Sequence, residues 1–125
     1  MQALQMTLEN LILLIVEDEF LIALDLQEIF LDAGITDIKI AASTNEALGI
    51  LSRDSVTVAI LDINLGSESS LEIALKLDQM KIPFLYHSGE AGYLDKEWPS
   101  APVISKPALP GALISAVSEL NKSIN

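Results

Sequence analysis

The sequence predicts an α/β fold in which helices cover both faces of a five-stranded parallel sheet. Short apolar runs typical of strands alternate along the chain with segments of helical period. Successive strands joined through helices imply right-handed crossovers and parallel neighbours. The chain has 125 residues, of which 50% are hydrophobic, so it is long enough to bury a substantial core in one domain.

The first predicted strand and helix follow each other directly. Residues 11–16 form a continuous apolar run bounded by acids, which is typical of a strand buried on both faces. From residue 20 to residue 33, apolar side chains recur at helical spacing, and Gly34 supplies a stop. These residues predict the first strand–helix pair.

The second strand–helix pair is predicted by its capping residues. Residues 38–41 have strand character, and Ser43 and Glu46 after them have the spacing of a capping box. We expect the helix that they open to end near residue 53.

The second half of the chain repeats the alternation. Residues 56–61 and 82–86 predict the third and fourth strands, with a helical stretch at 68–79 between them. Residues 103–104 form the core of a short fifth strand, and apolar residues follow one stripe of a last helix at 109–120. The sequence GEAGYLDKEWPSAP between the last two strands has little helical period, so we expect a short or irregular fourth helix there.

Composition excludes several classes of function. The formal net charge of -11 argues against binding a nucleic-acid backbone, which requires many lysines and arginines. The chain has no cysteine, so it forms no disulfide and no thiolate metal site, and a cytoplasmic location is expected. Neither an export signal nor a membrane span is indicated, because the apolar run at 11–16 is far too short. We expect residues 1–10 to be an N-terminal extension and residues 11–125 to form the domain.

Chemically active side chains follow four of the predicted strands. In parallel α/β sheets, ligands bind outside the carboxyl ends of the strands, where the winding order reverses. These strand ends carry Glu17-Asp18-Glu19, Asp62, His87-Ser88-Gly89 and Ser105-Lys106-Pro107. We therefore expect carboxylates, a hydroxyl and an ammonium group to converge at one edge of the sheet.

The converging carboxylates predict a magnesium site. Two such charges about 4 Å apart repel by about 4 kcal/mol at an effective dielectric constant near 20, so a group of three requires cations. Oxygen ligands without a histidine cluster favour a hard cation, and a few carboxylates with water suit Mg²⁺ better than Ca²⁺. A metal, a lysine and a hydroxyl are also what phosphoryl transfer to a carboxylate needs, and Asp62 is the candidate nucleophile.

Four motifs together resemble the receiver domains of two-component response regulators, over essentially the whole chain. They are LIVEDE, AILDINLG, YHSGE and SKP, each at the end of a different predicted strand. The resemblance implies a flavodoxin-like (CheY-like) doubly wound sheet with strand order 2-1-3-4-5. The chain ends soon after the last predicted helix, so we expect a stand-alone receiver.

The resemblance also implies a role for each site residue. Asp62 would be the phosphoacceptor, with Mg²⁺ held by Asp18, by Asp62 and by the backbone carbonyl of Asn64, while Glu17 would act through a metal-bound water. Ser88 and Lys106 would contact the phosphoryl group, and Asn64 and Glu90 would tune the access of hydrolytic water.

The resemblance further implies the partners. A histidine kinase or phosphotransfer protein would donate to Asp62 and would meet the helix at 20–33, and an unidentified downstream protein would read the signal. Such a receiver catalyses only its own phosphorylation and dephosphorylation.

One position departs from the family pattern. An aromatic residue that reports on the hydroxyl is usual three residues before the lysine, and that position is Val103 here. Tyr93 or Trp98 in the irregular stretch is a candidate substitute, and we expect that stretch to change order on phosphorylation. His87 points away from Ser88 by strand alternation, so a packed core or rim residue is expected there.

Two alternative functions remain open from the sequence. A pseudo-receiver would use the same fold as an interaction module without phosphorylation. A small Mg²⁺-dependent phosphohydrolase of the haloacid dehalogenase type would also use an Asp nucleophile after a strand. Those enzymes need a second Asp as general acid, and Asn64 occupies that position.

Overall fold

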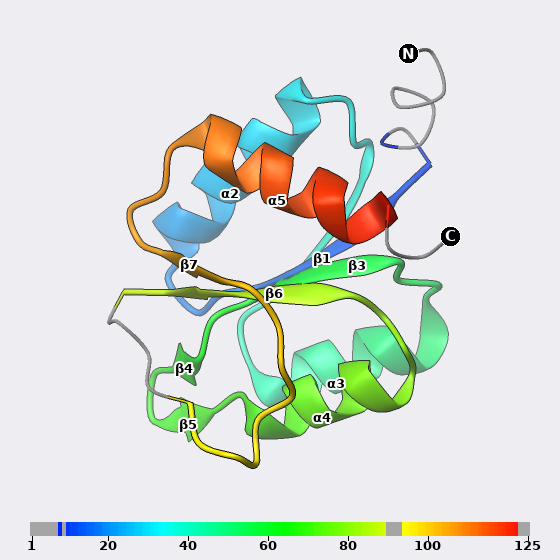
Figure 1. Cartoon of the computed structure of the whole chain (residues 1–125). Helices are drawn as coiled ribbons and strands as arrows, with labels where there is room; N and C mark the ends of the chain where they lie inside the picture. Colours follow the sequence, from blue (N-terminus) through cyan, green and yellow to red (C-terminus); the bar gives the residue numbers. More distant parts are fainter. Residues whose placement is uncertain (1–7, 9, 90–93, 123–125) are drawn as a thin grey trace.

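A five-stranded parallel sheet with helices on both faces forms the body of the molecule (Figure 1). The computed structural model describes residues 8, 10–89 and 94–122. The strands of the sheet are β1 (Ile12–Val16), β2 (Asp37–Ala41), β3 (Val58–Leu61), β6 (Phe84–Ser88) and β7 (Val103–Ser105). The helices are α2 (Phe20–Asp32), α3 (Thr44–Arg53), α4 (Leu71–Gln79) and α5 (Pro110–Lys122). A separate two-stranded hairpin contains β4 (Asn64–Leu65) and β5 (Glu68–Ser69).

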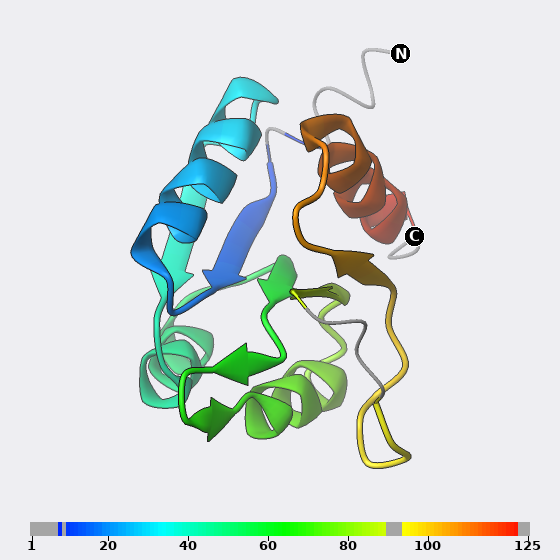
Figure 2. The ribbon, with the colours of Figure 1, turned by 90° about the vertical axis from the view of Figure 1, so that its left-hand side faces the viewer.

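The order of the strands confirms the predicted topology. The sheet runs β2-β1-β3-β6-β7, which is the order 2-1-3-4-5 when its strands are counted along the chain. Helices α2 and α5 cover one face, and α3 and α4 cover the other (Figure 1). The winding reverses between β1 and β3, so the ends of these two strands define the crevice where a ligand is expected. Figure 2 views the sheet from this end.

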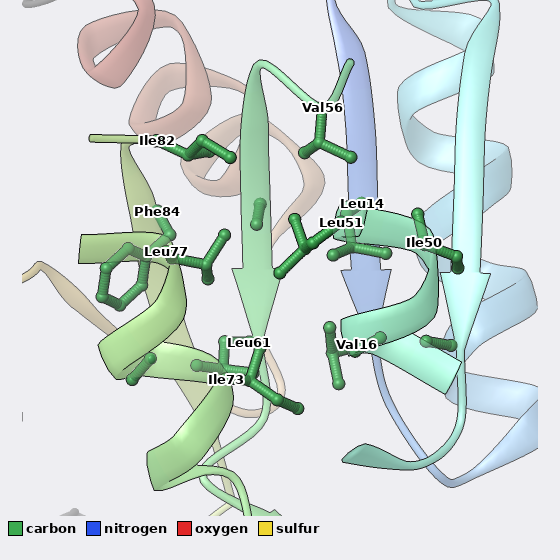
Figure 3. Packing of buried hydrophobic residues seen from close by; sticks show 14 of the residues in the cluster. Leu14, Val16, Ile50, Leu51, Val56, Leu61, Ile73, Leu77, Ile82 and Phe84 are labelled. Carbon is green, nitrogen blue, oxygen red and sulfur yellow. The ribbon is translucent and has the colours of Figure 1, made fainter. Parts of the chain in front are cut away.

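Each face of the sheet packs its own hydrophobic core. On β1, Leu14 and Val16 join the cluster under α3 and α4, which Figure 3 shows, while Leu13 and Ile15 join the cluster under α2 and α5. Successive strand residues point to opposite faces, which explains why a strand buried on both sides is apolar throughout. The prediction made from residues 11–16 is confirmed.

The capping box at the start of α3 is also present. Glu46 donates its backbone N–H to Ser43 Oγ at 3.2 Å, and Glu46 Oε1 accepts the backbone N–H of Ala42 at 2.7 Å. Two backbone donors at the helix start are thereby satisfied by side chains.

The helix predicted at 68–79 begins later, at Leu71. Gly66, with φ of +63°, turns the chain so that Leu65 pairs with Glu68 in the β4–β5 hairpin. Glu68 Oε1 then accepts the backbone N–H of Thr44 at 3.0 Å, at the start of α3. The prediction was wrong here because this hairpin and its long-range hydrogen bond compete with helical continuation.

Two predicted strands also differ in their bounds. The fourth strand of the sheet runs from Phe84 to Ser88 instead of 82–86, because Ile82 donates its N–H to Leu77 O at 2.9 Å and closes the end of α4. The third strand begins at Val58, two residues later than predicted.

The stretch before β7 contains turns and no helix in its described part, 94–102. Tyr86 holds this part against the sheet, because its hydroxyl donates to Pro99 O at 2.6 Å and its ring meets that of Trp98 edge-on. Glu90 and Tyr93 lie outside the described residues, as does most of the predicted N-terminal extension. Within the described part of the chain, no helix is long and apolar enough to cross a membrane.

Candidate functional site

One ammonium group bridges two buried carboxylates at the carboxyl end of the sheet. Lys106 Nζ lies 2.8 Å from Glu17 Oε1 and 2.9 Å from Asp62 Oδ2. Glu17 is 2% exposed and Asp62 is 6% exposed, so both charges are largely removed from water. Buried charges of this kind require paired partners, which Lys106 supplies.

Backbone hydrogen bonds extend the sheet to hold these three residues. Glu17 donates its N–H to Ala41 O at 2.9 Å, and Asp62 donates its N–H to Val16 O at 3.0 Å. The Lys106 N–H bonds Ser88 O at 2.7 Å, so the chain remains beside β6 after β7 ends. The parallel register thus brings together side chains that lie far apart in the sequence.

A third carboxylate, Asp18, completes an acidic cluster. Glu17, Asp18 and Asp62 each offer an oxygen, and these oxygens lie within 4.8 Å of one another. Asp18 is exposed, whereas the other two residues are buried, so the cluster opens to solvent on the Asp18 side. Three carboxylates face one lysine, and an all-oxygen donor set with a charge deficit fits Mg²⁺.

The electrostatics keep the bridging lysine charged. Burial lowers the pKa of Lys106, but hydrogen bonds to Glu17 and Asp62 outweigh burial, and the pKa is raised overall. Burial raises the pKa of Glu17, and hydrogen bonds from Lys106 and the Glu19 backbone oppose this shift. Lys106 is therefore a fixed cation at neutral pH beside the Asp62 carboxylate.

The remaining predicted site residues lie around this group. Ser88 is the last residue of β6 and is 3% exposed. Asn64 is exposed at the start of β4 and donates its backbone N–H to Asp62 Oδ1 at 3.3 Å. Val103, at the usual aromatic position, is 44% exposed on β7. The structure thus brings together Glu17, Asp18, Asp62 and Lys106 directly and places the Asn64 backbone against Asp62.

Sequence reasoning missed the direct pair between Glu17 and Lys106. The resemblance gave Glu17 only a contact through metal-bound water, yet its carboxylate lies 2.8 Å from the lysine in the structure. The excess of acids over lysines at the strand ends was the available signal, since one cation among several carboxylates is drawn to more than one of them.

Helix α2 presents apolar side chains beside this site. Phe20 and Leu21 are 72% and 78% exposed, and Leu24 and Leu31 are 40% and 47% exposed. A shallow depression on this helix is lined by Leu21, Leu24, Leu31 and the polar residues between them. These exposed side chains lie on the helix that the resemblance implies for the contact with the phosphodonor.

Comparisons with solved structures identify the family. The chain is 31% identical to SdrG from Sphingomonas melonis Fr1, with 90% of this chain and 97% of that chain covered and a TM-score of 0.78. It is 26% identical to a response regulator receiver protein from Sinorhizobium medicae WSM419, with 94% and 99% covered and a TM-score of 0.81.

A CheY-like receiver domain protein from Methanospirillum hungatei JF-1 shares the fold at 22% identity, with 90% and 94% covered and a TM-score of 0.78. No protein-family model and no curated protein matches the sequence. The order of the five parallel strands agrees with the fold of these solved structures. The chain belongs to the receiver domains of two-component response regulators.

Proposed function

We propose that this receiver accepts a phosphoryl group on Asp62 from a histidine kinase or phosphotransfer protein and signals through protein contacts. The observation that carries the proposal is the contact of Asp62 with Lys106, at 2.9 Å, in a cluster with two further carboxylates. This arrangement gives one carboxylate a fixed positive neighbour at the solvent-facing end of a rigid sheet.

The transfer step follows from the groups around Asp62. A carboxylate oxygen of Asp62 forms a bond to phosphorus while the donor's bond to phosphorus breaks and its electron pair leaves with the donor. The Lys106 ammonium pairs with the phosphoryl oxygens, and the Ser88 hydroxyl donates to one of them.

A magnesium ion fits the same cluster. Asp18, Asp62 and the Asn64 carbonyl would hold it directly, and Glu17 would hold it through water. When bound, Mg²⁺ supplies positive charge to the phosphoryl oxygens. The chain then catalyses only its own phosphorylation and dephosphorylation.

The same proposal assigns roles to residues around the site. Asn64 and Glu90 tune the approach of hydrolytic water to the phosphorylated site. In place of an aromatic residue at Val103, Tyr93 or Trp98 responds to phosphorylation, and the stretch GEAGYLDKEWPSAP changes order; the contact of Trp98 with Tyr86 on β6 supports Trp98 for this role.

The exposed apolar residues of α2 supply the face for the phosphodonor. Phe20, Leu21 and Leu24 follow directly after the Glu17–Glu19 acids, so a partner that covers them reaches Asp62. Desolvated apolar contacts beside the site are the kind of surface that protein partners use.

Intact mass after incubation with Mg²⁺ and acetyl phosphate tests the assignment. The wild type should gain one phosphoryl group, and Asp62→Asn should gain none. Asp54→Asn, which removes a carboxylate at the end of α3, is the matched control and should gain the group as the wild type does.

Three other results would contradict this assignment or favour an alternative function. An adduct that persists in Asp62→Asn would reject Asp62 as the acceptor. No adduct and no Mg²⁺ binding would favour the pseudo-receiver, and continuous release of phosphate without an adduct would favour the phosphohydrolase.

A further inference from the structure

His87 is a buried polar side chain that the proposed phosphoryl chemistry does not use. It lies on β6 with 4% of its surface exposed, and neither ring nitrogen has a hydrogen-bond partner among the described residues. Leaving a buried polar group without a partner costs about 1–3 kcal/mol. A group of this kind calls for a partner that is not part of the chain.

The imidazole borders a small pocket between α2 and α5. The pocket has a volume of about 140 Å³. Its other walls come from Ile22 and Leu26 on α2, Leu113 on α5 and the segment Lys106–Ala108 after β7. The exposed carboxylate of Asp25 also borders it. The two helices lie side by side over this face of the sheet (Figure 1).

The imidazole is neutral in this setting. Burial lowers the pKa of His87, and the charge of Lys106 lowers it further, while Asp62 opposes the shift. A neutral imidazole has one N–H donor and one nitrogen acceptor. His87, which lines this largely apolar pocket, therefore has one donor and one acceptor without a partner among the described residues.

The size and polarity of the pocket indicate which kind of molecule fits it. A cavity of about 150 Å³ is large enough to hold benzene, so this pocket has room for one six-membered ring. Water is held poorly, because a buried water needs two to four polar partners. Lys106 already directs its ammonium to Glu17 and Asp62, and Asp25 is exposed, which leaves the imidazole as the main polar group inside.

We propose that this pocket binds a small single-ring aromatic compound that carries a hydroxyl or N–H group, with the ring between α2 and α5 and the polar group hydrogen-bonded to His87. The ring replaces solvent against Ile22, Leu26 and Leu113, and the polar group supplies the partner that the imidazole lacks. The occupant would also contact Lys106, which lines the pocket. Any effect of the occupant on the rate of phosphoryl transfer to Asp62 rests on the proposed function.

Binding is tested with phenol as the probe and toluene as its apolar counterpart. In ¹H–¹⁵N spectra of the full chain, phenol should cause saturable shifts that centre on the pocket residues of α2, β6 and α5. Toluene, which fills the same volume without a hydroxyl, should bind at least about fivefold more weakly. The measurement uses unphosphorylated protein without Mg²⁺, so its result is independent of whether Asp62 accepts a phosphoryl group.

Two variants make the test specific. His87→Leu should weaken phenol binding at least about tenfold and remove the preference for phenol over toluene. Ala108→Leu narrows the pocket from the segment after β7 while leaving the imidazole in place, and it should weaken the binding of both probes. Because the second variant lies in a partly exposed segment, it keeps the test valid if His87→Leu fails to fold.

Three results would overturn the proposal. Phenol shifts that do not saturate or that centre elsewhere would show that the pocket is not a binding site. Equal binding of toluene would remove the role of His87. A crystal structure grown with saturating phenol that holds only water beside His87 would identify solvent as the occupant.

Discussion

Helices α2 and α3 follow neighbouring strands of one sheet, yet their surfaces differ. In α3, Ser43 accepts the Glu46 N–H at the start, Arg53 lies in the last turn, and every exposed residue is polar. In α2, Glu19 precedes the helix without a side-chain cap hydrogen bond, and four large apolar residues are exposed. The exposed surface of α3 is polar, whereas α2 carries the exposed apolar face that we propose for the phosphodonor.

The largest effect should come from the buried side of α2. Phe30 lies on the buried side of α2 and is 1% exposed. Phe30→Ala should lower the free energy of unfolding by about 3–5 kcal/mol, because apolar burial is lost and a cavity forms. Urea denaturation measures the change. Leu21→Ala on the exposed side of the same helix is the control and should stay within about 0.5 kcal/mol. Similar losses in both variants would show that the exposed leucine is part of the core.

The exposed side of α2 should matter for transfer instead of stability. Leu24→Glu places a charge on the proposed contact face and should slow phosphorylation by a protein donor about tenfold, equivalent to ~1.4 kcal/mol. Rates with acetyl phosphate, which needs no docking surface, should be unchanged. A protein donor that labels the variant as fast as the wild type would remove α2 from the contact.

The N-cap residues of the two helices should contribute different amounts to the free energy of unfolding. Ser43→Ala removes the oxygen that accepts the Glu46 N–H and should lower the free energy of unfolding by about 1 kcal/mol. Glu19→Ala at the matching position of α2 should cost less than half of this amount, because no side-chain cap bond is lost. Equal costs in thermal or urea denaturation would contradict the distinction.

The smallest effect on stability should come from Glu68, whose carboxylate accepts a backbone N–H at the start of α3. The hydrogen bond from the Thr44 backbone N–H, 3.0 Å long, lowers the pKa of Glu68 below its ordinary value. A lowered pKa in the folded state means that the contribution to stability is complete above the unfolded pKa and is lost as the pH falls through the folded pKa. The stability difference between wild type and Glu68→Gln should therefore be present at pH 7 and shrink below about pH 4.5. A difference that is independent of pH would exclude the charge of Glu68 as its source.

The sequence predicted those parts of the fold that depend on local or periodic signals. The apolar run at 11–16 predicted a strand buried on both faces, and Ser43 with Glu46 predicted the start of α3, and both predictions are confirmed. Glu68–Ser69 was predicted as helix because its pairing with Asn64–Leu65 and its bond to Thr44 depend on contacts that local periodicity does not contain. Ile82 was assigned to a strand because nothing in its neighbours indicates its bond to Leu77 across the end of α4.

The sequence predicted which residues form the site but not how their side chains pair. The strand ends predicted which side chains meet, since a parallel sheet brings its carboxyl ends to one edge. They did not predict that one lysine forms ion pairs with both Glu17 and Asp62, because that depends on side-chain geometry. The pocket at His87 was not predicted either, because a cavity between two helices depends on side chains from several elements at once.

The contact between Tyr86 and Trp98 gives the molecule a built-in optical reporter. Trp98 is the only tryptophan of the chain, and its ring centroid lies 5.9 Å from that of Tyr86. Burial, with a contribution from Asp78, raises the pKa of Tyr86 to about 12, so its hydroxyl keeps the proton that it donates to Pro99 across the working range of pH. Intrinsic fluorescence therefore reports the position of the segment before β7 without a label and without interference from the ionisation of Tyr86.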